Sequence, residues 1–287
     1  MIYRAGSLTR AFKPLETAFT CQTGVEVKDF PMGSVDAGRQ ITAGGKSADL
    51  YAPADYLDID LFMKPAGYST FDIVFAHGRM VLAYSAKKSP PVSATNWYKV
   101  LTMPGVTIGG GNFFLDPGAY RAPMIFQLAE DYYKVPNLYN DLLEHLVIPA
   151  GNNSDFQFTY EHNARASART NPDYHYIELP DEINLSDPAR DDYYKHHSIV
   201  VLPGLGTAKS ARTIAVPGNH LAWGIALMTG APNKENAIKF LELLLGPAGT
   251  KLLNENGPDP LTPAMVSAGD FRKLPESLRS LVKVNGK

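Results

Sequence analysis

Three short turns in this chain combine glycine with a hydroxyl or carboxyl side chain where a strand is expected to lead into a helix. They are Ala5-Gly6-Ser7, Met32-Gly33-Ser34 and Asp116-Pro117-Gly118. The first turn of a helix leaves backbone N–H groups unpaired, and the helix dipole favours negative charge there. Glycine lets the backbone come close to a ligand, and a serine hydroxyl adds a donor. Together these features predict a site for a small oxyanion held by neutral donors.

The same turns also have a purely structural interpretation. Serine is a preferred N-cap, and an aspartate followed by proline is a favourable start for a helix. A carboxylate beside a dianion is repulsive unless it is protonated or coordinates a metal centre. Capping and ligand binding therefore both stay open for Ser7, Ser34 and Asp116.

The first third of the chain alternates strand and helix signals. Short strands are expected at Ile2–Arg4, Val25–Phe30 and Ala48–Ala52. Between them, Leu8–Thr20 carries apolar residues at helical spacing, and Ser34–Ala43 predicts a second helix. This βαβαβ order predicts a mainly parallel sheet with helices on both faces.

The rest of the chain predicts a second lobe inserted into the first. Further strands are expected at Met80–Ser85, Phe156–Tyr160, Tyr174–Leu179, Ser198–Leu202, Thr213–Val216 and Trp223–Met228. Further helices are expected at Thr95–Thr102, Ala119–Tyr133, Asn137–Leu146, Asn233–Leu245 and Ala248–Asn254. We expect one lobe from residues 1–85 plus 199–287 and another from residues 86–198. A cleft at the hinge between two such lobes is a natural ligand site.

Composition is that of a soluble globular protein and narrows the range of partners. Of the 287 residues, 45% are hydrophobic and 20% charged, and a formal net charge of -2 gives no electrostatic case for nucleic acid. The single cysteine, Cys21, cannot form an internal disulfide or a Cys-rich zinc site. No apolar stretch approaches the roughly 20 residues that span a bilayer. No leader peptide is recognised, so a removed leader and synthesis without one both stay open.

No linear motif predicts catalysis. The patterns G-x-S-x-G, H-E-x-x-H and C-x-x-C do not occur in the sequence. His196 and His197 are expected on a strand edge, where they would point to opposite faces and bind no common metal. A binding protein without a cofactor is therefore the first interpretation. An enzyme on the same fold is a weaker alternative, because catalytic triads assemble in space and not in sequence.

An ordered set of segments across nearly the whole chain resembles the molybdate/tungstate-binding proteins of ABC importers, in particular their archaeal-type branch. The segments are AGSL at Ala5–Leu8, Gly33–Thr42, ADLYAPADY at Ala48–Tyr56, NFFLDPGAYRAPMIFQLAEDYY at Asn112–Tyr133, ELPDEINLSDP at Glu178–Pro188 and KFLELLLGPAGTKLLNENG at Lys239–Gly257. The resemblance implies a two-lobed α/β fold of the periplasmic binding-protein type II. In that fold each lobe is a mixed sheet flanked by helices, and the oxyanion lies in the cleft at the hinge.

The resemblance also implies a set of ligand-binding residues. They are Gly6, Ser7, Ser34, Asp116, Pro117, Gly118 and Tyr160, with Gly118 in place of a family cysteine. In the related branch an aspartate and a glutamate complete an octahedral shell around the metal, which implies direct contact of Asp116 with molybdenum or tungsten. The segment that carries the glutamate is shortened here to Leu146–Asp155, and Glu144 is the nearest candidate. Tetrahedral binding by N–H and O–H donors is therefore an alternative to octahedral coordination. Arg121 is expected either to reach the cleft or to pair with an acidic neighbour.

The expected function is capture of molybdate or tungstate and delivery to the membrane permease of an ABC importer. The resemblance implies a periplasmic or extracellular location, whereas the lack of a recognised leader leaves a cytoplasmic one open. We expect a monomer that does not itself span the membrane. Another small oxyanion such as sulfate or phosphate is the alternative ligand on the same fold.

Overall fold

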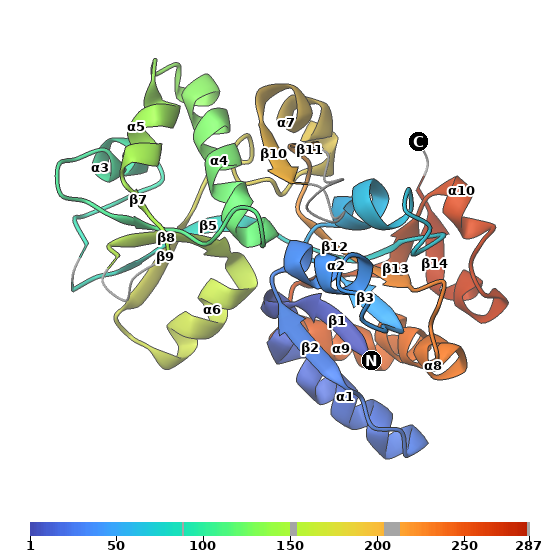
Figure 1. Ribbon diagram of the computed structural model, residues 1–287. Helices are drawn as coiled ribbons and strands as arrows, with labels where there is room; N and C mark the ends of the chain where they lie inside the picture. The colour runs from blue at the N-terminus through green and yellow to red at the C-terminus, as the bar shows by residue number, and fades with distance from the viewer. Residues whose placement is uncertain (88, 150–153, 204–212, 286–287) are drawn as a thin grey trace. The chain divides into compact units, whose positions relative to one another are not determined.

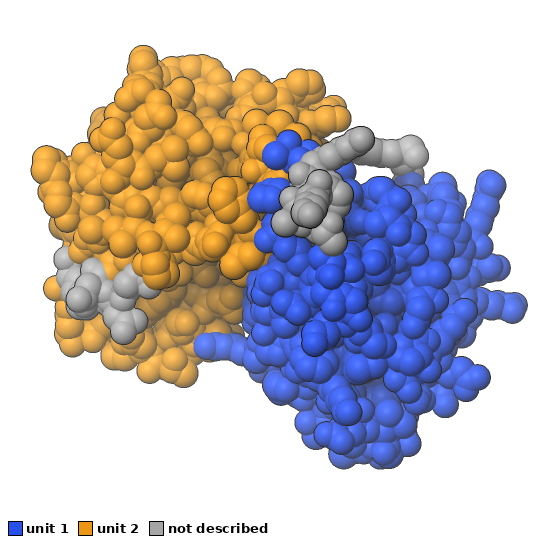
Figure 2. Space-filling model, viewed as in Figure 1, with its two compact units in different colours: residues 1–77, 203–214, 222–287 blue, residues 78–202, 215–221 orange. Residues whose placement is uncertain are grey.

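The computed structural model describes residues 1–87, 89–149, 154–203 and 213–285 (Figure 1). The chain divides into two units (Figure 2). Unit 1 comprises residues 1–77, 203–214 and 222–287, and unit 2 comprises residues 78–202 and 215–221. Each unit is therefore assembled from separate stretches of the chain, and each has its own main sheet.

Unit 1 is built on a mixed sheet with the strand order β14-β13-β4-β12-β3-β1-β2. Its strands are β1 (Ile2–Ala5), β2 (Asp29–Met32), β3 (Leu50–Ala52), β4 (Ile73–His77), β12 (Ala222–Leu227), β13 (Asp259–Val266) and β14 (Val282–Val284). β1 pairs in parallel with β2 and β3, so that Ala5 lies opposite Met32 and Arg4 opposite Ala52. β12 runs antiparallel to both β3 and β4. The parallel part confirms the sheet expected from the βαβαβ pattern.

Helices with one apolar face cover the sheet of unit 1. They are η1 (Gly6–Leu8), α1 (Thr9–Thr23), α2 (Ser34–Thr42), η2 (Ile59–Met63), α8 (Lys234–Leu245), α9 (Pro247–Asn256), α10 (Ala268–Phe271) and η4 (Glu276–Leu281). In α1, Phe12 and Phe19 are buried, as their helical spacing predicts. Their rings pack 6.0 and 5.4 Å from that of Phe240 in α8, measured between centroids. Aromatic packing between α1 and α8 thus fixes the helix that follows the first glycine-serine turn.

Unit 2 has a smaller mixed sheet with the strand order β7-β6-β8-β5-β9. Its strands are β5 (Met80–Ser85), β6 (Ile108–Gly109), β7 (Leu146–Val147), β8 (Phe156–Tyr160) and β9 (Tyr174–Glu178). The helices of this region are α3 (Trp97–Leu101), α4 (Pro117–Tyr133), α5 (Leu138–Glu144), α6 (Glu161–Thr170), η3 (Pro188–Arg190) and α7 (Asp191–His197). A separate two-stranded sheet joins β10 (Ile199–Pro203) to β11 (Thr213–Pro217).

The division into units differs from the expected lobe boundaries at β5. We expected Met80–Ser85 to end the first lobe, but this strand lies in unit 2. It pairs antiparallel with β8 and β9, with Met80 opposite Tyr160 and Val81 opposite Glu178. An apolar strand that is paired on both sides belongs to the core of the sheet it joins, and its sequence alone does not identify that sheet.

Several elements differ from the sequence expectation. The strand expected at Val25–Phe30 is β2 at Asp29–Met32, because pairing with β1 begins only at Asp29. His196 and His197 lie in the last turn of α7 and not on a strand. The acidic residues of the first turn of α7 and the basic ones of its last turn complement the helix dipole. The helix α6, with sequence EHNARASART, has no apolar repeat by which to be predicted.

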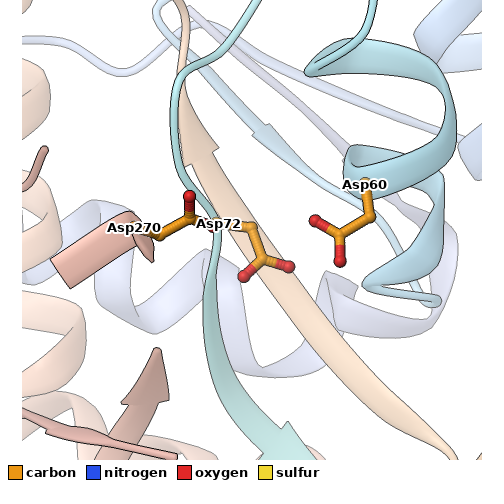
Figure 3. Close-up of side chains that lie close together, drawn as sticks. All are labelled: Asp60, Asp72 and Asp270. Atoms are coloured by element: carbon orange, nitrogen blue, oxygen red, sulfur yellow. The ribbon is translucent and has the colours of Figure 1, made fainter. Parts of the chain in front are cut away.

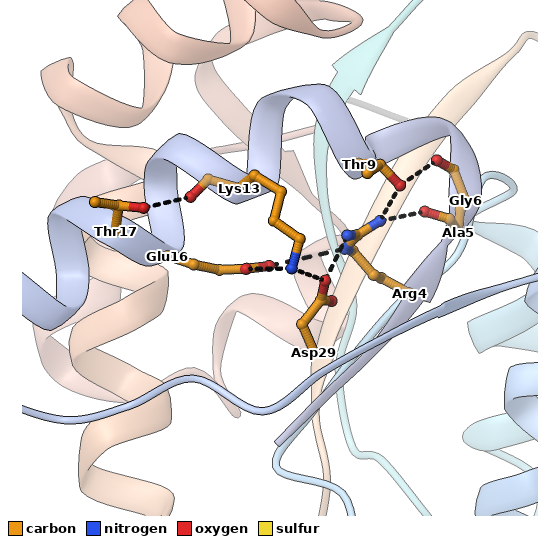
Figure 4. A network of polar contacts seen from close by, with 8 residues as sticks. All are labelled: Arg4, Ala5, Gly6, Thr9, Lys13, Glu16, Thr17 and Asp29. Carbon is orange, nitrogen blue, oxygen red and sulfur yellow. Dashed lines mark hydrogen bonds and ion pairs between the residues drawn. The ribbon is translucent and has the colours of Figure 1, made fainter.

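A buried ion-pair network holds β1, β2 and α1 together below the first turn (Figure 4). The side chain of Arg4 is fully buried, and its Nη2 lies 2.6 Å from Asp29 Oδ2. Arg4 Nη1 donates to the carbonyl of Ala5 at 3.1 Å and to Thr9 Oγ1 at 2.8 Å. Thr9 in turn donates to the carbonyl of Gly6 at 2.7 Å. Arg4 thereby connects the β1–β2 pair to the backbone of the Gly6-Ser7 turn.

Loss of the Arg4 guanidinium should strongly destabilise unit 1. We expect Arg4→Met to lower the free energy of unfolding by about 3 kcal/mol, because Asp29 would keep a buried charge without its buried partner. Lys13→Met is the matched control, since Lys13 Nζ also contacts Asp29 Oδ2, at 3.0 Å, but its side chain is 59% exposed. This control should cost about 1 kcal/mol or less. Urea unfolding of both variants measures the difference, and equal losses would show that burial of Arg4 is not the cause.

Candidate functional site

The first two glycine-serine turns lie side by side at one edge of the sheet in unit 1. Because β1 and β2 are parallel and in register, Ala5 and Met32 end their strands together. Gly6-Ser7 and Gly33-Ser34 follow directly and begin η1 and α2. A Cβ placed on Gly6 would lie 3.9 Å from the carbonyl oxygen of Met32, which shows how closely the two turns approach. The structure therefore brings together the unit 1 residues that the sequence singled out.

Both serine hydroxyls are held by hydrogen bonds that they accept. Trp223 Nε1 donates to Ser7 Oγ at 3.1 Å. The backbone N–H of Ala54 donates to Ser34 Oγ at 2.9 Å, and the Tyr51 hydroxyl donates to the Ser34 carbonyl at 2.8 Å. A hydroxyl oxygen that accepts one hydrogen bond directs its own proton away from that donor. These contacts hold each oxygen in place.

Neither serine caps its helix. The N-cap positions of η1 and α2 are Ala5 and Gly33, and neither helix has a side-chain cap hydrogen bond. Ser34 is buried, whereas Ser7 is partly exposed. The interpretation of these two serines as N-caps is therefore wrong.

The third turn does cap its helix. Asp116 is the N-cap of α4, and its Oδ1 accepts from the N–H of Gly118 at 2.6 Å. Pro117 occupies the first turn, where it needs no N–H donor. A Cβ on Gly118 would lie 3.1 Å from Asp116 Oδ1 and 3.4 Å from the hydroxyl oxygen of Tyr160. Glycine at position 118 thus leaves space between the carboxylate and the phenol.

Tyr160 is brought to the same place by the sheet of unit 2. It is the last residue of β8 and is 5% exposed. Its hydroxyl oxygen accepts from Arg121 Nη1 at 3.1 Å. This bond holds the phenolic oxygen beside Gly118, and a phenol also carries an O–H donor. Asp116, Gly118 and Tyr160 therefore form one cluster in unit 2, with Arg121 behind the phenol.

The charges in this cluster act on Asp116 in opposite directions. Burial raises the pKa of the Asp116 carboxyl, while the Gly118 N–H and the Arg121 guanidinium lower it by smaller amounts. The net result is a pKa above the ordinary range of an aspartate. Arg121 is fully buried, so that its charge acts in a medium of low dielectric constant and favours an anion nearby.

Glu144 is not brought to this cluster. β6 and β7 are parallel, with Ile108 opposite Leu146, and β6 is also parallel to β8, with Ile108 opposite Phe156. Glu144 precedes β7 and therefore lies at the edge where these strands begin, whereas Tyr160 lies where β8 ends. The Glu144 side chain is also exposed. Glu161, which directly follows Tyr160, is paired with Arg79 at 3.4 Å and Arg165 at 3.8 Å.

The contacts of two residues beside these clusters depend on the tertiary fold. Trp223 contacts Ser7 across 216 positions of the chain, and only the pairing of β12 within the sheet places it there. Arg121 was expected to reach the cleft or to form a salt bridge, and its guanidinium hydrogen-bonds Tyr160. Arg121 lies in the first turns of α4, on the helix face that packs against β8. The sequence alone does not show which strand this face meets.

Each unit therefore has hydroxyl groups beside the start of a helix. Such an arrangement can bind oxygen atoms of an anion by hydrogen bonds from neutral donors. No helix within the described residues is long and apolar enough to cross a membrane.

Comparison with known proteins identifies relatives across most of the chain. Residues 1–258 match a family model described as bacterial extracellular solute-binding protein. The molybdate/tungstate-binding protein WtpA of Pyrococcus abyssi is 31% identical over 331 residues, which cover 99% of this chain and 90% of that protein.

Two solved structures are similar in fold. The sulfate-binding protein SubI of Mycobacterium tuberculosis superimposes with a TM-score of 0.67 at 17% identity, covering 91% of this chain and 86% of that one. The periplasmic molybdate-binding protein of Azotobacter vinelandii gives a TM-score of 0.62 at 17% identity, with coverage of 91% and 98%. These similarities confirm the two-lobed α/β fold that the sequence led us to expect.

The raised pKa of Asp116 predicts how its substitution changes stability with pH. The folded protein holds this proton more tightly than the unfolded chain, so the contribution of Asp116 to stability is lost as pH rises through the folded-state pKa. Asp116→Asn keeps a capping oxygen but does not titrate. The unfolding free energy of Asp116→Asn, measured relative to that of the wild type, should therefore increase as pH rises from 4 to 8. Urea titrations across this range test the expectation, and a constant difference between the two proteins would contradict it.

Proposed function

Because this chain belongs to the bacterial extracellular solute-binding protein family, we propose that it captures molybdate or tungstate. Ser7 and Ser34 of unit 1 and the cluster of Asp116, Gly118 and Tyr160 of unit 2 supply the proposed contacts to the anion. The full-length similarity to a molybdate/tungstate-binding protein supports this choice of ligand. The captured anion would then be delivered to the membrane permease of an ABC importer, on the periplasmic or extracellular side.

The observation that carries the proposal is the state of the three hydroxyl groups. The oxygens of Ser7, Ser34 and Tyr160 each accept an N–H, from Trp223, Ala54 and Arg121 respectively. Each hydroxyl oxygen is thereby held in place, and a hydroxyl group can donate to an oxyanion. Preorganised donors of this kind lower the cost of ordering on binding. Glycine at position 118 leaves space between the Asp116 carboxylate and the Tyr160 hydroxyl.

We further propose that the anion binds as a tetrahedral ion held by these donors. An octahedral shell needs two carboxylates next to the metal, and Glu144 lies at the opposite edge of its sheet. Asp116 already uses Oδ1 to cap α4, and burial favours its neutral form. In this arrangement the helix starts and Arg121 balance the charge of the dianion. Selection against sulfate would depend on a site wide enough for the longer metal–oxygen bonds.

Sulfate or phosphate is the second candidate. The similarity in fold to a sulfate-binding protein supports it, as does a donor set of neutral hydroxyl and N–H groups, which suits any tetrahedral oxyanion. Catalysis has no comparable support, since the family model describes solute binding.

Calorimetric titration with tungstate, molybdate, sulfate and phosphate tests the ligand directly. We expect tungstate and molybdate to bind tightly, and each should raise the melting temperature in proportion to RT ln(1 + [L]/Kd). Sulfate and phosphate should bind at least about a hundredfold more weakly, a difference of about 2.7 kcal/mol. The Asp116→Asn variant should retain tungstate binding within about threefold if coordination is tetrahedral. Binding of sulfate alone would instead support the second candidate. A loss of tungstate affinity above a hundredfold in Asp116→Asn would show that this carboxylate coordinates the metal directly.

Removal of the Ser7 hydroxyl should weaken binding. A hydrogen bond to a charged group contributes about 1.5–3 kcal/mol, so Ser7→Ala should raise the Kd for tungstate by about 10- to 100-fold. Trp223→Phe is the matched control, because it deletes the same N–H···O contact and leaves the hydroxyl in place. Its Kd should rise less than that of Ser7→Ala. If both variants lose affinity equally, Ser7 acts through its contact with Trp223 and not on the anion.

A further inference from the structure

Three aspartates of unit 1 meet at a place that the proposed function does not use. Asp60 lies in η2, Asp72 precedes β4, and Asp270 lies in α10 (Figure 3). Each offers a carboxylate oxygen, and these three oxygens all lie within 4.8 Å of one another. The residues come from distant parts of the sequence, so the cluster results from the tertiary fold and not from a local acidic run.

Asp72 is the unusual member of this cluster. The residue is 5% exposed, and its Oδ2 is buried without a hydrogen-bond donor among the described residues. In Figure 3 its carboxylate points into the space between Asp60 and Asp270. A buried carboxylate without a donor costs several kcal/mol unless a cation or a proton compensates it. The side chain is therefore a buried, unpaired ligand aimed at two other carboxylates.

Two lysines compensate the other members of the cluster but not Asp72. Lys64 Nζ contacts Asp60 and lies 2.6 Å from Asp270 Oδ2. Lys273 Nζ lies 3.0 Å from Asp270 Oδ1. Within the part of the chain that the structure describes, neither ammonium forms an ion pair with Asp72. With all three carboxylates ionised, the five groups carry three negative and two positive charges.

We propose that Asp60, Asp72 and Asp270 form a binding site for a divalent cation of the calcium type, which replaces the ammonium group of Lys64. All the offered ligands are carboxylate oxygens, which hard cations such as Ca²⁺ prefer and which do not favour zinc or copper. Calcium–oxygen distances are about 2.3–2.6 Å, so two ligands on opposite sides of the ion are about 4.6–5.2 Å apart. Carboxylate oxygens within 4.8 Å of one another are compatible with such an ion.

Lys64 can make way for the ion. Its side chain is 23% exposed and that of Asp60 is 35% exposed, so the cluster is open to solvent on this side. A flexible lysine side chain can turn its ammonium outward. The cation would then contact all three carboxylates at once, which the ammonium does not do. Lys273 would remain on Asp270, and the charges of the three aspartates, the ion and Lys273 would sum to zero.

Protonation of Asp72 is the alternative way to neutralise its buried charge. Burial is the largest factor that raises the pKa of Asp72 well above its ordinary value, followed by the charge of Asp60, while Lys64 opposes the shift. The charge of Asp270 raises it further. The ion and the proton therefore compete for the same carboxylate, and the experiment must distinguish them.

Calcium titration of the full chain, without added oxyanion, tests the site. Calorimetry of wild-type protein with CaCl₂ should show one site with a Kd on the order of 10⁻⁴–10⁻³ M, a range seen in extracellular calcium modules. A calcium concentration about tenfold above the Kd should raise the melting temperature by about 2–4 °C. Absence of both signals would overturn the proposal and leave Asp72 as a protonated side chain.

Three variants assign the signal to this cluster. Asp72→Asn loses no observed hydrogen bond and should fold, but its calcium response should be abolished. Lys64→Met removes the competing ammonium and should bind calcium about tenfold more tightly. Glu255→Gln, a control on an exposed carboxylate of the same unit, should respond like the wild type. A calcium response that persists unchanged in Asp72→Asn would place the ion elsewhere and overturn the proposal.

Discussion

The parallel pairing of β1 with β2 and β3 is the constraint on which the binding surface of unit 1 depends. With Ala5 opposite Met32 and Arg4 opposite Ala52, three strands end at one edge. Ser7, Ser34 and the Ala54 N–H then follow within two residues of those ends. The buried Arg4–Asp29 ion pair stabilises this register. Any other register of β1 against β2 would separate the two charges and leave each buried without its partner.

Both units hold a hydroxyl group in the same way, although their sheets differ. In each, a hydroxyl near the end of a strand accepts a hydrogen bond from an N–H group behind it. The donor behind is the Trp223 indole for Ser7 and the Arg121 guanidinium for Tyr160. The two places differ in charge: the cluster of unit 2 has a buried arginine and a carboxylate, whereas the serines of unit 1 are held by neutral groups.

The sequence predicted the elements that are determined by the local pattern of residues. Strand, turn and helix in Ile2–Thr23, the span of β8 and the Asp116 cap all follow from periodicity and capping chemistry. The strand at residues 25–30 was misplaced because its position is decided by its partner β1. The helix α6 was missed because it has almost no apolar face. The partners of the site hydroxyls could not be predicted, since they are set by strand order. Whether the predicted site residues bind an anion stays a prediction.

The contact between Trp223 and Ser7 also limits when unit 1 can complete its fold during synthesis. Ser7 is synthesised 216 residues before its indole partner, Trp223. β12, which carries Trp223, inserts between β3 and β4, so the central sheet of unit 1 is incomplete until that strand has been synthesised. The stretch from Gly78 to Leu202, which forms most of unit 2, is contiguous and is complete earlier. The complete sheet of unit 1 can therefore form only after β12 has been synthesised, whereas most of the chain of unit 2 is available earlier.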